Sequence, residues 1–240
     1  MFSLTFVVAC LLLHVSSSSP RILDSIDYVL FVSDRHMECS QYPLKLLRNY
    51  LPGSEIHFIT TPDLAAEQEQ VNDDPMMSYY SIETSPETEE LEQTYVHSGV
   101  NDREYELFCF MRWLHMANHI RTSGLHGNVL VIDSDVAVLT SALRLIETTN
   151  PTCLECTFLS IELGAVSIIH TEQIVAFSNY LLWVYRQSPK HLTAYIKQWG
   201  ILRQIDTKRN DKDDDQINSD QIIHFSDMWA IKAYCLTKGT

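Results

Sequence analysis

Residues 127–136 read GNVLVIDSDV, and the rest of the chain is interpreted outward from this stretch. Four apolar residues at positions 129–132 end abruptly at two carboxylates one residue apart. Such a run predicts a strand that is buried on both faces and ends at a polar rim. Side chains alternate along a strand, so Asp133 and Asp135 would point to one side and Ser134 to the other. Two oxygen ligands that face one point suit Mg²⁺ or Mn²⁺ carrying a diphosphate.

An ordinary structural explanation exists for the same residues. Asp and Ser commonly follow a strand because their side chains satisfy the backbone groups of a turn. The position of the carboxylates after a fully apolar strand favours a binding site, since open α/β sheets bind their ligands at the carboxyl ends of strands.

Composition limits the domain count and the partners. The chain has 240 residues, of which 45% are hydrophobic, enough for one sizeable core and too few for two comfortable domains. The formal net charge is −14, which disfavours nucleic acid or an anionic membrane surface as a partner. We therefore expect a single acidic globular domain.

The first residues have the composition of a leader. Residues 2–15 are mostly apolar and are followed by four serines and Pro20. This run is long enough for a signal-peptide core and too short to span a bilayer comfortably. We expect a signal peptide at residues 1–19 and entry into the secretory pathway, in the ER or Golgi lumen or as a secreted protein. A short uncleaved anchor is the alternative, and membrane association is expected only if this segment is retained.

The order of apolar patterns predicts an α/β fold with a mostly parallel central sheet flanked by helices. Strands are predicted at 28–32 and 56–60 around a helix at 42–50, and an amphipathic helix at about 102–121 leads into the 129–132 strand. Residues 62–101 are acidic and poor in apolar anchors, and they predict a long loop with a short helix. Thr171 is the predicted N-cap of a helix that ends near Gln187. The remaining predictions are strands at 158–163 and 164–169 and helices at 141–147 and 219–231.

Two further side chains are candidates for chemistry. Arg112 lies among apolar neighbours, where a guanidinium either pairs with an acid or reaches an anionic ligand, and the pattern alone favours the pairing. Asp227 also has apolar neighbours, which can raise the pKa of a carboxylate and suit it to proton transfer. An N-cap formed by Ser226 or Asp227 explains the same residues equally well.

These motifs together resemble a known family. The strand ending in Asp133-Ser134-Asp135, preceded by the helix of Glu106 and Arg112, resembles nucleotide-sugar-dependent glycosyltransferases of the GT-A fold with a DXD motif. The segment Ser226-Asp227-Met228 is similar to one found in a group of sugar-transferase-like proteins. The resemblance implies a Rossmann-like GT-A domain over residues 24–240. It also implies Mn²⁺ or Mg²⁺, a UDP-sugar or similar donor, and a hydroxyl of a glycan or protein as the acceptor.

The resemblance also implies roles for individual residues. Asp135 would bind the metal on the diphosphate, and Asp133 would contact the ribose or share the metal. Arg112 would lie near the diphosphate, and Asp227 would be the catalytic carboxylate on the acceptor side. The other donor-binding residues would be Ser33, Asp34 and Ser134.

One departure from the family pattern leaves alternatives open. GT-A enzymes commonly supply a further ligand, often a His, from a later segment, and this chain stops at Thr240. The chain would then be truncated at its C-terminus, use a shorter metal site, or bind sugar nucleotide without transfer. Haloacid-dehalogenase-like phosphatases also end a strand in Asp-x-Asp, but their motif normally opens the domain and continues with Thr or Val where this chain has Ala137.

Overall fold

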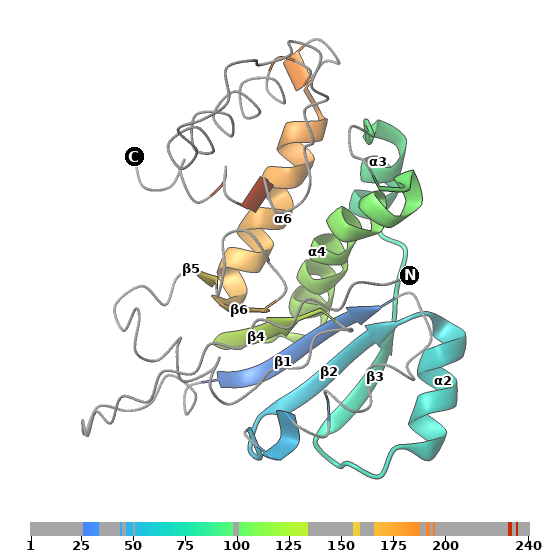
Figure 1. The fold of residues 1–240 in the computed structure, drawn as a ribbon, viewed down its shortest axis with the longest axis vertical. Helices are drawn as coiled ribbons and strands as arrows, with labels where there is room; N and C mark the ends of the chain where they lie inside the picture. The colour runs from blue at the N-terminus through green and yellow to red at the C-terminus, as the bar shows by residue number, and fades with distance from the viewer. Residues whose placement is uncertain are drawn as a thin grey trace, which may run out of the picture.

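The fold is built on one six-stranded sheet (Figure 1). The computed structural model describes residues 26–33, 44, 47–49, 51–97, 101–133, 156–158, 166–187, 191, 192, 194, 230, 231 and 234. The strand order is β3-β2-β1-β4-β6-β5. The strands are β1 Ile26–Ser33, β2 Glu55–Thr60, β3 Met77–Ser81, β4 Asn128–Ile132, β5 Cys156–Phe158 and β6 Val166–His170.

Strand direction confirms the predicted α/β class with a mostly parallel sheet. The pairings β1–β2, β2–β3 and β1–β4 are parallel, whereas β6 runs antiparallel to both of its neighbours, β4 and β5. From β1 the chain moves outward to β2 and β3, and then returns to place β4 on the other side of β1. The boundary between β1 and β4 is therefore the point where the winding of the sheet reverses.

Two helices, α4 Arg103–Ser123 and α6 Thr171–Tyr185, pack on one face of the sheet and against each other (Figure 1). A third helix, α3 Pro86–Thr94, packs against both of them at the end away from the strands. Their core includes Trp113 and Phe110 from α4, and Val131 from β4. The Asp102 side chain caps α4 by accepting the N–H groups of Glu104 and Tyr105. The predicted helix at 102–121 is thus confirmed.

A second core lies on the opposite face. It joins Phe31, Phe58 and Ile132 from the sheet to Leu44 and Leu47, among others. Leu44 and residues 47–49 are helical, in agreement with the helix predicted at 42–50. Since β4 contributes to both cores, its four apolar residues are all buried, as its sequence predicts.

The prediction of a long loop with one short helix over residues 62–101 is wrong about the loop, because this region has two helices and a strand. This region contains α2 Pro62–Val71, then β3, then α3. The apolar signal is weak for a physical reason: α2 fully buries only Ala65, and β3 is an edge strand whose side chains are partly buried or exposed. Such elements need few apolar residues because most of their surface faces water.

Smaller differences concern the second half of the chain. The N-cap of α6 is His170 and not Thr171, because the His170 ring accepts the Glu172 N–H while the Thr171 N–H donates to the Gly127 carbonyl. The strand predicted at 164–169 is confirmed as β6, and β5 ends at Phe158, where the strand predicted at 158–163 was to begin. The helix predicted at 141–147 and most of that at 219–231 lie outside the described residues.

Candidate functional site

The carboxyl ends of β1 and β4 lie side by side and carry two of the predicted site residues. Ser33 is the last residue of β1, and Asp133 follows β4 directly. The two strands are paired in register, with Leu30 opposite Val131. Ligands of open α/β sheets bind at the carboxyl edge where the winding reverses. Fold and sequence motif therefore indicate the same edge.

An ion pair marks this edge. The Nη1 group of Arg112 on α4 donates a hydrogen bond to Oδ1 of Asp133. The Arg112 side chain is 11% exposed and the Asp133 side chain 26%, so the pair is partly screened from water yet reachable. The Arg112 guanidinium also lies 5.6 Å from the centre of the Trp113 ring. The prediction that Arg112 pairs with an acid is confirmed, and the acid is the first carboxylate of the DXD motif.

Ser33 does not join this pair. Asp133 is two residues after Val131, so its side chain points to the same face, toward α4. Ser33 is two residues after Phe31, so its side chain points to the opposite face. Ser33 is 5% exposed and lies in register with Thr60 of β2. The Thr60 hydroxyl oxygen is buried and has no hydrogen-bond partner among the described residues. Ser33 and Asp133 therefore share an edge of the sheet but point to different faces.

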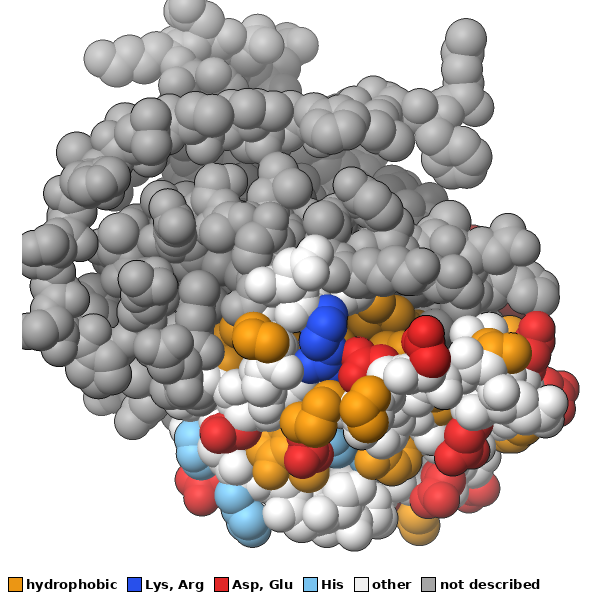
Figure 2. Space-filling model, turned by 90° about the horizontal axis from the view of Figure 1, so that it is seen from below, with side chains coloured by type: hydrophobic (Ala, Val, Ile, Leu, Met, Phe, Trp, Pro, Cys, Tyr) orange, Lys and Arg blue, Asp and Glu red, His pale blue; other side chains and the backbone are white. Residues whose placement is uncertain are grey.

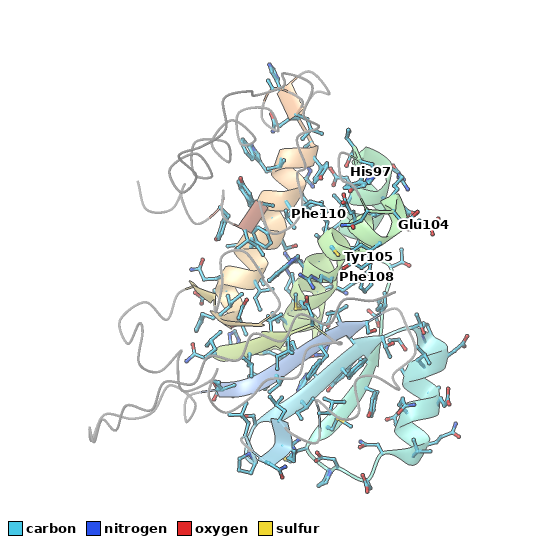
Figure 3. All side chains as sticks on the ribbon, in the orientation of Figure 1. His97, Glu104, Tyr105, Phe108 and Phe110 are labelled. Atoms are coloured by element: carbon cyan, nitrogen blue, oxygen red, sulfur yellow. The ribbon has the colours of Figure 1, made fainter. Side chains whose placement is uncertain are left out.

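One stripe of α4 faces the sheet and includes Arg112. Positions 105, 108, 112, 115 and 119 recur at spacings of three and four residues, which places them along one side of a helix. Tyr105 and Phe108 are labelled on this part of α4 in Figure 3. Tyr105 is 47% exposed and lies seven residues from Arg112, roughly 10 Å along the axis. Because α4 passes from His119 beside β2 to Arg112 at the carboxyl end of β4, this aromatic part of the stripe continues beyond that edge.

Sequence reasoning missed this stripe. The readable signal was three nitrogen-bearing side chains at helical spacing in an otherwise apolar helix: Arg112, His115 and His119. His115 is 5% exposed, and its Nδ1 is buried without a hydrogen-bond partner in the described part of the chain. Burial lowers the pKa of His115 to about 4. This histidine is therefore neutral near pH 7.

A buried carboxylate anchors the start of α4. Oε2 of Glu106 lies 3.4 Å from the Tyr95 hydroxyl and 3.5 Å from Nδ1 of His97, and Oε1 accepts the Asn101 N–H. Burial and the adjacent Glu106 charge raise the pKa of the Tyr95 hydroxyl. Since Glu106 is 4% exposed and bonds groups at residues 95–101, its contacts hold this segment against the helix. They suit a structural role.

Of the two predicted metal ligands, Asp133 and Asp135, only Asp133 is among the described residues. Asp34, Ser134, Asp135 and Asp227 lie outside the described residues, and among those described no cluster of three or more His, Cys, Asp or Glu side chains could hold a metal ion. The half-buried Asp133 carboxylate offers the hard oxygen that Mg²⁺ and Mn²⁺ prefer. The guanidinium beside it is suited to the diphosphate that such an ion would carry. The donor chemistry of the pair thus fits a metal–diphosphate ligand.

Comparison with known proteins does not identify a family for this chain. No protein-family model matches the chain, and no curated protein matches it either. Within the described ranges, none of the helices is long and apolar enough to cross a membrane.

Proposed function

We propose that the protein is a metal-dependent glycosyltransferase that moves a sugar from a nucleotide-diphosphate donor to a hydroxyl acceptor on a glycan or protein. The observation that carries the proposal is the Arg112–Asp133 pair at the carboxyl end of β4, beside the reversal of the sheet. A mostly parallel sheet with helices on its faces supports a Rossmann-like GT-A fold. The signal peptide expected at residues 1–19 would place this activity in the secretory pathway.

The chemistry of transfer assigns a role to each residue. The acceptor oxygen attacks the anomeric carbon, the bond from that carbon to the diphosphate oxygen breaks, and negative charge builds on the leaving diphosphate. Arg112 would stabilise that charge by donating hydrogen bonds, as preorganised cationic donors do. A divalent ion held by Asp133 and Asp135 would supply further charge neutralisation. Asp227 would take the proton of the acceptor hydroxyl if the reaction inverts the anomeric centre.

The ion pair also bears on the phosphatase alternative. In that mechanism Asp133 would be the nucleophile, and a guanidinium bonded to its oxygen would weaken its attack on phosphorus. In a transferase the same contact is useful, because the diphosphate attracts the guanidinium and frees Asp133 for the ion. The pair therefore favours transfer over phosphate hydrolysis.

Donor hydrolysis tests the proposal without knowledge of the acceptor. The experiment measures Mn²⁺-dependent release of nucleotide from a panel of UDP- and GDP-sugars, with UDP-sugars first, by the native chain. Asp135→Ala and Asp133→Asn should abolish release, whereas Asp63→Asn, on the exposed surface of α2, should not change it. Donor binding without release would identify a non-catalytic sugar-nucleotide-binding protein. Absence of both would refute the donor site, and release of phosphate from simple monoesters would favour the phosphatase.

A further inference from the structure

A buried histidine pair joins α4 to β2 outside the candidate site. Nδ1 of His57 lies 2.7 Å from Nε2 of His119, and the two residues are 4% and 7% exposed. Nε2 of His57 is 3.2 Å from Oε2 of Glu55, and Nδ1 of His119 is 3.3 Å from the Ser123 hydroxyl. These four side chains form a chain of hydrogen bonds from an exposed carboxylate to an exposed hydroxyl.

The Glu55 carboxylate decides which atom donates in each of these hydrogen bonds. An ionised Glu55 only accepts hydrogen bonds, so Nε2 of His57 must donate and Nδ1 of His57 must accept. Nε2 of His119 therefore donates to His57, and Nδ1 of His119 accepts from the Ser123 hydroxyl. Both rings are then neutral Nε2–H tautomers, and every ring nitrogen has one partner.

The pair tolerates one additional proton but not two. A first proton can enter at Nδ1 of His119, where the Ser123 hydroxyl turns to accept instead of donate. A second proton can enter only at Nδ1 of His57, which already faces the Nε2–H of His119 at 2.7 Å. Two N–H donors cannot share that separation, so the second proton must part the rings.

Packing around the pair makes each added proton costly. The Tyr80 ring of β3 lies 5.1 Å from the His57 ring and 4.2 Å from the His119 ring, and Tyr28 of β1 meets His57 edge-on. The other titratable groups near the pair are Glu55 on β2 and His115, one turn along α4. Burial lowers the pKa of His57 against the opposing effect of Glu55. Burial, with the neighbouring His57, lowers the pKa of His119 to about 4.

The same helical stripe connects the pair to the candidate site. His119 and Arg112 are seven residues apart, so they lie on one side of α4, roughly 10 Å apart along its axis. His119 holds the helix against β2, and Arg112 holds it against Asp133. Since a helix moves as a rigid element, releasing one contact displaces the other.

We propose that the His57–His119 pair is a proton-sensitive positioning element that keeps α4 on the sheet and thereby sets Arg112 against Asp133. At neutral pH the chain of hydrogen bonds is complete and α4 is fixed. Acidification favours the separated rings, which bind protons that the closed pair excludes, and this separates α4 from β2 and weakens the Arg112–Asp133 contact. Only the effect on donor binding rests on the proposed function. The contacts themselves can be tested without any nucleotide.

Nuclear magnetic resonance and hydrogen exchange provide the test. In ¹⁵N-labelled native protein at neutral pH, both rings should show the Nε2–H tautomer. Lowering the pH to about 5 should reduce the protection factors of the α4 amides around Arg112 by about tenfold or more, after correction for intrinsic exchange. The double variant His57→Asn, His119→Gln should keep an amide–amide hydrogen bond at every pH and lose this dependence. His126→Gln, which changes an exposed histidine outside the pair, should behave as the native chain.

Glu55→Gln provides a second variant that does not disturb the core. Its side chain is 55% exposed, so the variant should fold normally. Because the Glu55 charge favours protonation of the pair, its removal should move the loss of α4 protection to lower pH by about half a unit or more. An Nδ1–H tautomer on either ring, or an unchanged pH dependence in both variants, would overturn the proposal. So would micromolar Zn²⁺ binding that requires both histidines, because the pair would then be a metal site.

Discussion

At the scale of single residues, Gly127 is the position where the backbone most clearly requires glycine. Its φ angle is 120°, a backbone conformation that residues other than glycine rarely adopt, and a Cβ atom at this position would collide with the Asp27 carboxylate. That carboxylate accepts the Asn128 N–H at the start of β4. Gly127 thus allows the backbone to pass close to Asp27 just before the strand that ends at Asp133.

Replacing Gly127 with alanine should therefore destabilise the fold. We expect Gly127→Ala to lower the free energy of unfolding by about 2–4 kcal/mol through backbone strain and displacement of Asp27. Gly53→Ala is the matched control, because a Cβ at Gly53 meets no atom within 4 Å. Denaturant unfolding of both variants would decide the matter, and equal midpoints would contradict the assignment.

The ion pair at the candidate site should show energetic coupling. In a double-mutant cycle of Arg112→Ala and Asp133→Ala, we expect a coupling energy of about 1–3 kcal/mol, because both side chains are shielded from water. The control is Arg186–Glu90, which joins α6 to α3 at the surface with side chains 55% and 34% exposed. That cycle should give less than about 1 kcal/mol. Comparable values for the two cycles would show that Asp133 is more solvated than its geometry indicates.

At the scale of elements, α4 should make the protein sensitive to acid. The folded-state pKa values of His115 and His119 are about 4, against 6.5 for an unperturbed histidine. As the pH falls below 6.5 the unfolded chain binds protons that the folded chain does not, so stability is lost between pH 6.5 and about 4. A shift of this size is worth about 3 kcal/mol for one histidine.

A single substitution separates the contribution of His115 to the acid sensitivity from that of the His57–His119 pair. His115→Leu removes a buried nitrogen that has no described hydrogen-bond partner, and it should flatten the dependence of unfolding free energy on pH between 6.5 and 4. Urea unfolding at several pH values measures this slope. Met116→Leu, which changes a buried side chain of the same helix without a titratable group, should leave the slope as it is. A slope unaffected by His115→Leu would show that this ring binds protons equally in the folded and unfolded chain.

The elements also show which features the sequence could predict. The β4 strand and α4 were predictable because buried elements require continuous or periodic apolar residues, and the capping Asp102 marks the helix start. The elements α2, β3 and α3 were missed because they lie at the margin of the sheet. A capping box at Ser85 and Thr88 was nevertheless readable as the start of α3.

The site was predictable only in part, for a different reason. Pairing of Arg112 with an acid followed from its apolar neighbours, but the choice of Asp133 depended on how α4 crosses the sheet from β2 to the carboxyl end of β4. The His57–His119 pair could not be predicted, since it depends on the position of β2 in the sheet and on the path of α4 across it. Contacts between distant elements depend on topology, which a local pattern does not contain.

At the scale of the whole molecule, charge opposes the proposed donor. The net charge is −14, and acidic side chains are spread over the described part of the face in Figure 2, with only a small basic patch. A nucleotide diphosphate must therefore approach against a repulsive field. Salt screens such fields over about 10 Å at 0.1 M.

The association rate of UDP should accordingly rise with ionic strength. We expect about a two- to tenfold increase between low and moderate salt at fixed Mn²⁺, because screening removes repulsion and not attraction. Stopped-flow measurement of tryptophan fluorescence, to which Trp113 of α4 contributes, would follow the binding of UDP. A rate that falls with salt would show that the positive charge of Arg112 dominates the local field.

The position of β4 also has a consequence for how the chain folds. Asp27 and Asn128, which meet where β1 and β4 pair, are 101 residues apart in the sequence. The β1–β2 and β2–β3 pairings close much shorter loops and can form first, whereas β4 must wait for α3 and α4. Arg112 and Asp133 are only 21 residues apart, but the edge where β1 meets β4 exists only after β4 has been made. A chain still emerging from the ribosome therefore holds β1, β2 and β3 without the edge at which the donor is proposed to bind.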